Sequence, residues 1–346
     1  MRYLAAAGTY AAPEGKGLYI IQVDEKGSMK IAGNTGARDV GFLAADEQGR
    51  HIYATCESLY FRGTASGGIS AYEIEDSGNP VFLNETATEG QMPCHLLKHG
   101  DRLYASSFLS GCISVHDILE DGKVSPVTAC IRLDRRKGIA PSVHCTAVTP
   151  DGRYLCALDA TGHRICFFRL DNGNYETAFT YEFPEPFTVR PRQAVFGERN
   201  LYVVTETGHE LLTFRYCPKT PEELLRLAGS SDLIPPEYRG KSRGSGIRLT
   251  PDGKCLICSV RYTDVLTSFL VGEDGMAADK KILRTQGACP RDLDISPDGK
   301  WALAGMQHSG KMELYRIDSG RNCLEYVSDI PGIQSCTGVR FLHREG

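Results

Sequence analysis

The strongest constraint on the fold of this 346-residue chain is a hairpin pattern that recurs along its whole length. Residues 289–307, CPRDLDISPDGKWALAGMQ, contain an alternating apolar run, the turn Pro297-Asp298-Gly299-Lys300 and a second apolar run. Alternation predicts strands, and Pro-Asp-Gly between two of them predicts a tight turn. Because a hairpin doubles back, residues before its first strand and after its second should lie at the same end.

The pattern occurs six times, and each copy continues into a third alternating strand. Its turns are 46 to 55 residues apart and contain Arg50, Asp101, Arg153, Arg199, Lys254 and Lys300. A repeat of about 40–50 residues made of short strands is typical of a β-propeller, with one four-stranded blade per repeat.

The two ends of the chain complete one more blade. Residues 3–23 predict two strands around a Gly/Pro loop, and residues 336–342 predict a first strand with nothing after it. We therefore expect an all-β, seven-bladed β-propeller in which one blade is closed by N- and C-terminal strands. The repeat favours a single domain over residues 1–346.

Residues 217–243 depart from the pattern. In TPEELLRLAG, Thr220 as N-cap, Pro221 at the first helical position and Glu223 in a capping box predict a short helix ended by Gly229. Residues 235–238 then predict an extended run. Long loops are often lids or binding loops, and a surface elaboration without a role is the alternative.

Composition narrows the function classes. The formal net charge is −4 and no basic patch appears, which argues against nucleic acid as a partner. No apolar run is long enough to span a bilayer. Thirteen cysteines without a signal peptide suggest a reducing, cytoplasmic location. Cys255 and Cys258 have CxxC spacing, but on a strand they point to opposite faces and no second CxxC completes a metal site.

The hairpin ends predict the functional site. Residues before the first strands and after the second strands should ring one mouth of the central channel, whereas the opposite end carries ordinary turn residues. Taken one at a time, each polar residue in the ring has a purely structural explanation: a histidine can be hydrogen-bonded within the fold, and a charged residue can form a surface ion pair. Together they indicate an active or binding face. The candidates are His95, His144, Arg192, Arg291, Glu57, Glu206, Arg261 and Gln307.

Several of these segments resemble a known family. PSVHCTAVTPDGRYL, RPRQAVFGERNLYVVTE, IRLTPDGKCLICSVR and CPRDLDISPDGKWALAGMQHSG are similar to the lactonase family of seven-bladed β-propellers. That family includes bacterial 6-phosphogluconolactonase and fungal 3-carboxy-cis,cis-muconate lactonising enzyme. The residues that match its motifs are His144, Arg192, Glu206, Arg261, Arg291 and Gln307. The chain has Arg190-Pro191-Arg192-Gln193 where the family commonly has Gly-Pro-Arg-His, so a second histidine is absent.

The resemblance implies hydrolysis of a sugar lactone, most directly 6-phosphogluconolactone, without metal or cofactor. His144 or Glu206 would act as base. Arg192 or Arg291 would polarise the lactone carbonyl. Arg261, Gln307, His95 and Glu57 would bind substrate, with arginines holding a phosphate or carboxylate.

Two alternatives keep the same site. One is a cycloisomerase that closes a muconate-type dicarboxylate, and the other is a non-catalytic sugar-acid binder. In each case we expect a small anionic partner, no nucleic acid or membrane, and a monomer or weak homo-oligomer.

Overall fold

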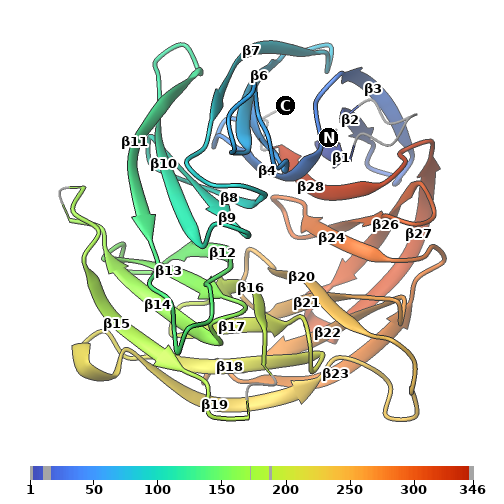
Figure 1. Cartoon of the computed structure of the whole chain (residues 1–346). Helices are drawn as coiled ribbons and strands as arrows, with labels where there is room; N and C mark the ends of the chain where they lie inside the picture. The colour runs from blue at the N-terminus through green and yellow to red at the C-terminus, as the bar shows by residue number, and fades with distance from the viewer. Residues whose placement is uncertain (1–2, 11–16, 172, 187–188, 343–346) are drawn as a thin grey trace.

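The computed structural model describes residues 3–10, 17–171, 173–186 and 189–342. Seven four-stranded antiparallel sheets stand in a ring around a central axis (Figure 1). Within the described residues the only helical segments are two three-residue 3-10 turns, η1 (Pro221–Glu223) and η2 (Ser319–Arg321). The prediction of an all-β, seven-bladed propeller is confirmed. The Gly/Pro loop expected near the N-terminus falls largely in residues 11–16, outside the described residues.

Six blades follow one another in chain order, each running from an inner strand to an outer one. Blade 1 consists of β4 (Val40–Ala45), β5 (His51–Cys56), β6 (Gly68–Ile74) and β7 (Pro80–Ala87). Blade 2 consists of β8 (Pro93–His99), β9 (Arg102–Ser107), β10 (Cys112–Ile118) and β11 (Val124–Arg132). Blade 3 consists of β12 (Val143–Val148), β13 (Tyr154–Asp159), β14 (Arg164–Arg169) and β15 (Thr177–Glu182).

Blade 4 consists of β16 (Pro191–Phe196), β17 (Asn200–Thr205), β18 (Glu210–Tyr216) and β19 (Leu225–Asp232). Blade 5 consists of β20 (Arg243–Leu249), β21 (Cys255–Arg261), β22 (Val265–Val271) and β23 (Ala277–Arg284). Blade 6 consists of β24 (Pro290–Ile295), β25 (Trp301–Met306), β26 (Lys311–Asp318) and β27 (Cys323–Pro331).

The seventh, closing blade joins the two ends of the chain, as predicted. Its inner strand is the C-terminal β28 (Cys336–Leu342), which pairs antiparallel with β1 (Tyr3–Thr9). Two further N-terminal strands, β2 (Leu18–Val23) and β3 (Met29–Thr35), complete the sheet. Because the last strand is hydrogen-bonded to the first, the ring is closed by a sheet rather than left with two open ends.

The Pro-Asp-Gly turns form the hairpins that the sequence predicts. In blade 6 the N–H of Gly299 donates to the carbonyl of Ser296 at 2.8 Å, and the Ser296 hydroxyl donates to Asp298 at 2.8 Å. Gly299 has φ +74°, a conformation that side chains with a Cβ adopt at a cost. Blades 3 and 5 contain the same turn, with threonine in place of serine. Each second strand therefore returns to the level at which its inner strand began.

The apolar cores lie between the faces of neighbouring blades. One core joins Cys255 and Ile257 of blade 5 to Leu293 and Ala302 of blade 6. Cys258 instead packs in the core between blades 4 and 5. The two cysteines of the CxxC sequence thus point to opposite faces of β21, as the strand period predicts.

The predicted helix at residues 220–229 is wrong. Only η1 is helical, and the Thr220 side chain makes no capping hydrogen bond within the described residues. The rest of the segment forms β19, which pairs with β18 along its whole length. Pairing with an open sheet edge and burial of Leu224 and Leu225 outweigh the weak local helix preference. Residues 235–238, expected to be extended, make a turn in which Tyr238 N–H donates to the Pro235 carbonyl at 3.0 Å.

Candidate active site

Every inner strand carries a β-bulge near its first residue. In blades 2, 3, 4 and 6 the extra residue is Cys94, His144, Arg192 and Arg291, respectively. The register also shifts at Thr337 in the closing blade, at residues 41–42 in blade 1 and at residues 245–246 in blade 5. A bulge leaves one residue out of the ladder and re-aims its side chain. The predicted site residues His144, Arg192 and Arg291 all occupy this position.

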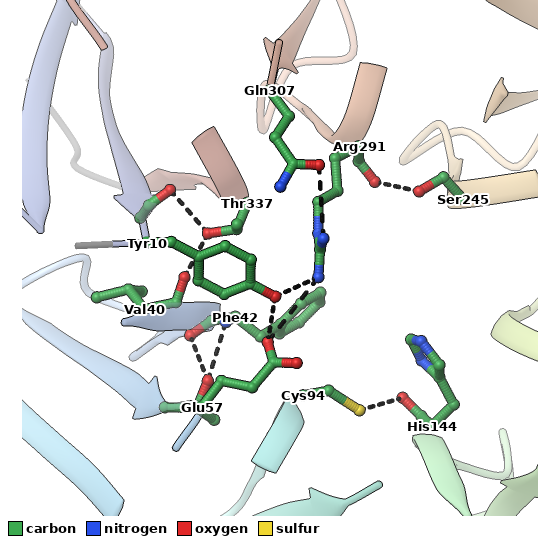
Figure 2. A network of polar contacts seen from close by, with 12 residues as sticks. Tyr10, Val40, Phe42, Glu57, Cys94, His144, Ser245, Arg291, Gln307 and Thr337 are labelled. Atoms are coloured by element: carbon green, nitrogen blue, oxygen red, sulfur yellow. Dashed lines mark hydrogen bonds and ion pairs between the residues drawn. The ribbon is translucent and has the colours of Figure 1, made fainter. Parts of the chain in front are cut away.

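Arg291 is the centre of one cluster at this end of the ring (Figure 2). Its guanidinium donates to the Tyr10 hydroxyl, and its Cζ lies 4.9 Å from the centre of the Tyr10 ring. Tyr10 in turn donates to Glu57 at 2.8 Å, and Arg291 lies 3.9 Å from the same carboxylate. Gln307 accepts from Arg291 at 3.5 Å. Residues from three blades thus hold one guanidinium group in place.

Glu57 is the acidic member of this cluster. Its side chain is only 8% exposed. Burial raises the pKa of Glu57, while the positive charge of Arg291 opposes that rise. Gly41 leaves room for the carboxylate, because a Cβ at that position would lie 2.3 Å from Glu57 Oε2.

A second cluster surrounds Glu206. Arg261 donates to its carboxylate at 3.1 Å. Arg190 and Arg243 lie 3.5 and 3.6 Å from it. Burial alone would raise the pKa of Glu206. The positive charges of the nearby arginines, above all Arg192 and Arg261, outweigh burial and lower it. Glu206 is therefore an ionised counter-charge for several arginines.

Arg192 is buried between the two clusters, with 4% of its surface exposed. Burial, together with the positive charges of Arg261 and Arg291, lowers the pKa of Arg192 to about 9. Its Nε and Nη1, and the Nε of Arg261, have no hydrogen-bond partner in the part of the chain that the structure describes. Buried donors without partners are costly unless a ligand satisfies them.

His144 lies beside these arginines. Its ring meets Phe108 edge-on at 5.7 Å, and its Nδ1 is buried with no partner among the described residues. Burial lowers the pKa of His144 well below the usual histidine value, and the charge of Arg192 adds to this shift. The imidazole is therefore neutral, so its unprotonated nitrogen is available as a proton acceptor.

His95 differs from the other candidates, because Cys94 occupies the bulge of blade 2. The His95 ring lies 4.4 Å from the Phe42 ring. Its Nδ1 accepts from the N–H of Thr146 at 3.4 Å, and its Nε2 is 3.5 Å from the sulfur of Cys145. Burial and the charge of Arg248 lower the pKa of His95 to about 3. These contacts hold His95 against blades 1 and 3 rather than against the arginines.

Comparison with known proteins gives the family. A sequence profile described as "Lactonase, 7-bladed beta-propeller" matches residues 4–341. The chain belongs to this lactonase family. It is 25% identical over 357 residues to the 6-phosphogluconolactonase of Bacillus subtilis (strain 168), covering 99% of both chains. It is also 25% identical over 323 residues to the 6-phosphogluconolactonase of Klebsiella pneumoniae subsp. pneumoniae, covering 91% of this chain and 92% of the relative.

Solved structures agree on the fold of this lactonase-family chain. The periplasmic gluconolactonase of Pseudomonas aeruginosa superposes with a TM-score of 0.87, covering 100% of each chain at 21% identity. At that identity the likeness concerns the fold alone.

Sequence reasoning missed Tyr10, which follows β1 as Glu57 follows β5. The N–H of Tyr10 donates to the Ser335 carbonyl at 3.2 Å. The hydrogen bond from the N–H of Glu57 to the Asp39 carbonyl occupies the equivalent position in blade 1. The candidates after second strands were located from their hairpin turns. In the closing blade the inner strand β28 pairs with β1 from the other end of the chain, so no hairpin turn joins the two. The signal was available in the sequence, because Tyr10 directly follows the strand paired with residues 336–342.

A cavity of about 780 Å³ opens at the other end of the axis. It is lined by the inner strands, from Phe42 at the blade 1 bulge and His95 just after the blade 2 bulge to Glu47 and Pro297 at the turns. Its charged side chains are paired, as in the 2.9 Å contact of Arg248 with Asp294 and the 2.7 Å contact of Lys98 with Glu47. The unsatisfied donors of Arg192 and Arg261 lie at the bulge end, so we place the candidate site there.

The described ranges contain no group of three or more His, Cys, Asp or Glu side chains arranged to hold a metal ion. They also contain no helix of the length and apolarity required to cross a membrane.

Proposed function

We propose that this protein hydrolyses a sugar lactone, most directly 6-phosphogluconolactone to 6-phosphogluconate. The observation that carries the proposal is the buried Arg192, whose unsatisfied N–H groups lie beside the neutral His144. Ester hydrolysis needs an activated water and donors for the developing oxyanion. The names of the two relatives support the choice of substrate.

Arg192 polarises the lactone carbonyl in this proposal. Its unsatisfied donors point to a bound oxygen ligand, and a guanidinium group in a buried site stabilises negative charge strongly. Arg291 holds the same end of the substrate. Its position is fixed by Tyr10, Glu57 and Gln307 before any ligand arrives, which lowers the entropic cost of reaching the reactive geometry.

His144 takes the proton from the attacking water. The water oxygen bonds to the carbonyl carbon, and the proton passes to the free imidazole nitrogen. The ring C–O bond then breaks, and the imidazolium returns the proton to the departing ring oxygen. Glu206 is less suited to this role, because Arg261, Arg190 and Arg243 occupy its carboxylate oxygens, whereas the Nδ1 of His144 has no partner among the described residues.

The setting of the reaction is part of the proposal. The protein acts as one domain over residues 1–346, in the cytoplasm, on a small anionic lactone, without cofactor, nucleic acid or membrane, as a monomer or weak homo-oligomer. Thirteen free cysteines support a reducing compartment.

A lactone-opening assay at mildly acidic pH, where spontaneous opening is slow, tests the function. We expect the wild-type protein to open 6-phosphogluconolactone, and Arg291→Ala and His144→Ala each to lower kcat/KM by about 100-fold or more. Arg199→Ala is the matched control, because this side chain is 71% exposed at the turn end of blade 4. A wild-type protein that opens no lactone, or variants as active as the control, would contradict the assignment. Turnover of a muconate-type dicarboxylate instead would favour the cycloisomerase.

A further inference from the structure

Two arginines of the Glu206 cluster, Arg190 and Arg243, are more exposed to solvent than the rest of it. Arg190 and Arg243 occupy equivalent positions in blades 4 and 5, next to the inner-strand bulges. The Arg190 carbonyl accepts from Glu206 N–H at 2.7 Å, and Arg243 pairs with Arg261 across the ladder. Their side chains are 28% and 34% exposed, compared with 9% for Arg261. They therefore lie where a substituent of a bound substrate would reach from the buried centre.

Both side chains converge on one carboxylate. Arg190 lies 3.5 Å and Arg243 3.6 Å from opposite oxygens of Glu206, and Arg261 donates to the same group at 3.1 Å. Three guanidinium groups face a single negative charge, so two positive charges are in excess. The whole chain has a net charge of −4, so this excess is local.

The donors of this group are also incompletely used. The Nε atoms of Arg190 and Arg261 are buried and have no hydrogen-bond partner within the described ranges. A purely structural ion pair would need only one arginine for Glu206, and each further arginine adds repulsion. A ligand with two negative charges and several acceptor oxygens would both balance the charge and accept from the free N–H groups.

We propose that Arg190 and Arg243 form, with Arg261, a phosphate subsite that makes the protein select phosphorylated lactones over unphosphorylated ones. Glu206 holds the three guanidinium groups in position rather than contacting the reacting carbonyl. This inference rests on the proposed lactonase function. It assigns to the two more exposed arginines the recognition of the phosphate substituent rather than a part in the hydrolysis itself.

The test compares the hydrolysis of 6-phosphogluconolactone with that of unphosphorylated gluconolactone. The variants are Arg190→Ala, Arg243→Ala and the double variant, with Arg199→Ala as the exposed-arginine control. We expect kcat/KM for 6-phosphogluconolactone to fall about 10- to 100-fold in each single variant, the size of a lost charge-assisted hydrogen bond. The kcat/KM for unphosphorylated gluconolactone should change by less than about threefold. Arg190→Lys keeps the positive charge but loses the paired N–H donors of the guanidinium group, so the fall in kcat/KM should be intermediate.

Calorimetric binding of the products separates this inference from the proposed function. Wild-type protein should bind 6-phosphogluconate more tightly than gluconate, and the variants should lose that preference even if no lactone is turned over. Equal losses for both substrates, or no loss for either, would overturn the subsite. Equal affinity of wild-type protein for the two products would overturn it as well. If Arg190→Ala fails to fold, as judged by thermal unfolding, Arg190→Lys and Arg243→Ala carry the test.

Discussion

Replacing Gly41 with alanine should disable the Arg291 cluster without deleting any of its side chains. A Cβ at residue 41 would lie 2.3 Å from Glu57 Oε2 and 3.0 Å from Glu57 Cβ. Gly41 is not among the residues with positive φ, so its backbone accepts alanine. The added methyl group therefore acts mainly by displacing the carboxylate of Glu57.

The structure sets the size of the effect. Non-bonded heavy atoms settle near about 3.5 Å, so the carboxylate has to retreat by about 1.2 Å. The 2.8 Å hydrogen bond from Tyr10 then opens beyond hydrogen-bonding range, and the 3.9 Å ion pair with Arg291 lengthens further. If the displacement is passed on to Arg291, a misplacement of about 1 Å there costs about 100-fold in rate. The lost buried hydrogen bond should lower the free energy of unfolding by about 1–3 kcal/mol.

Steady-state lactone hydrolysis and urea unfolding measure both quantities. Gly36→Ala is the control, because a Cβ there meets nothing within 4 Å in the described structure and Gly36 does not have positive φ. In a Glu57→Ala background, Gly41→Ala should have a much smaller further effect on kcat/KM, since the carboxylate contact is gone and only the 3.0 Å contact with the Cβ of residue 57 remains. Full activity of Gly41→Ala, or an equal loss in both backgrounds, would refute the reasoning.

Three further predictions concern Tyr10, Glu206 and the turn at Gly253. Tyr10→Phe removes the hydroxyl that joins Glu57 to Arg291, so kcat/KM should fall about tenfold, the equivalent of one hydrogen bond of about 1.4 kcal/mol, and an unchanged value would contradict the bridging role. Glu206→Gln should lower the free energy of unfolding by about 2–4 kcal/mol at pH 7. The folded-state pKa of Glu206 is lowered by its arginines, so its contribution is present above the unfolded pKa and lost as pH falls through the folded one. The difference in free energy of unfolding between wild type and variant, measured with urea, should therefore shrink towards pH 3. A difference that grows on acidification would contradict a lowered pKa of Glu206. Gly253→Ala, at a turn with φ +71° and at the opposite end of the ring, should cost about 1 kcal/mol in thermal unfolding and leave lactone hydrolysis unchanged, whereas a loss of activity would argue against a site at the bulge end.

The sequence by itself determined the hairpins, and through them the blades. Strand alternation and the Pro-Asp-Gly turn are local properties, because each acts between residues only a few positions apart. Six repeats and two complementary ends then leave a closed ring as the arrangement that pairs every strand. The same hairpin argument predicted that His144, Arg192 and Arg291 share one end, since a doubled-back chain returns its polar ends to the same level.

Tertiary structure decided what those residues do. Residues 225–232 are a strand rather than part of a helix because β18 offers an edge for pairing, which no local pattern reveals. Tyr10 meets Arg291 across 281 positions of sequence, so that contact exists only once the ring has closed. Whether Glu206 is a base or a counter-charge depends on arginines brought from two blades. Ionisation and hydrogen bonding respond to distances in space, and those distances are set by the packing of blades rather than by spacing along the chain.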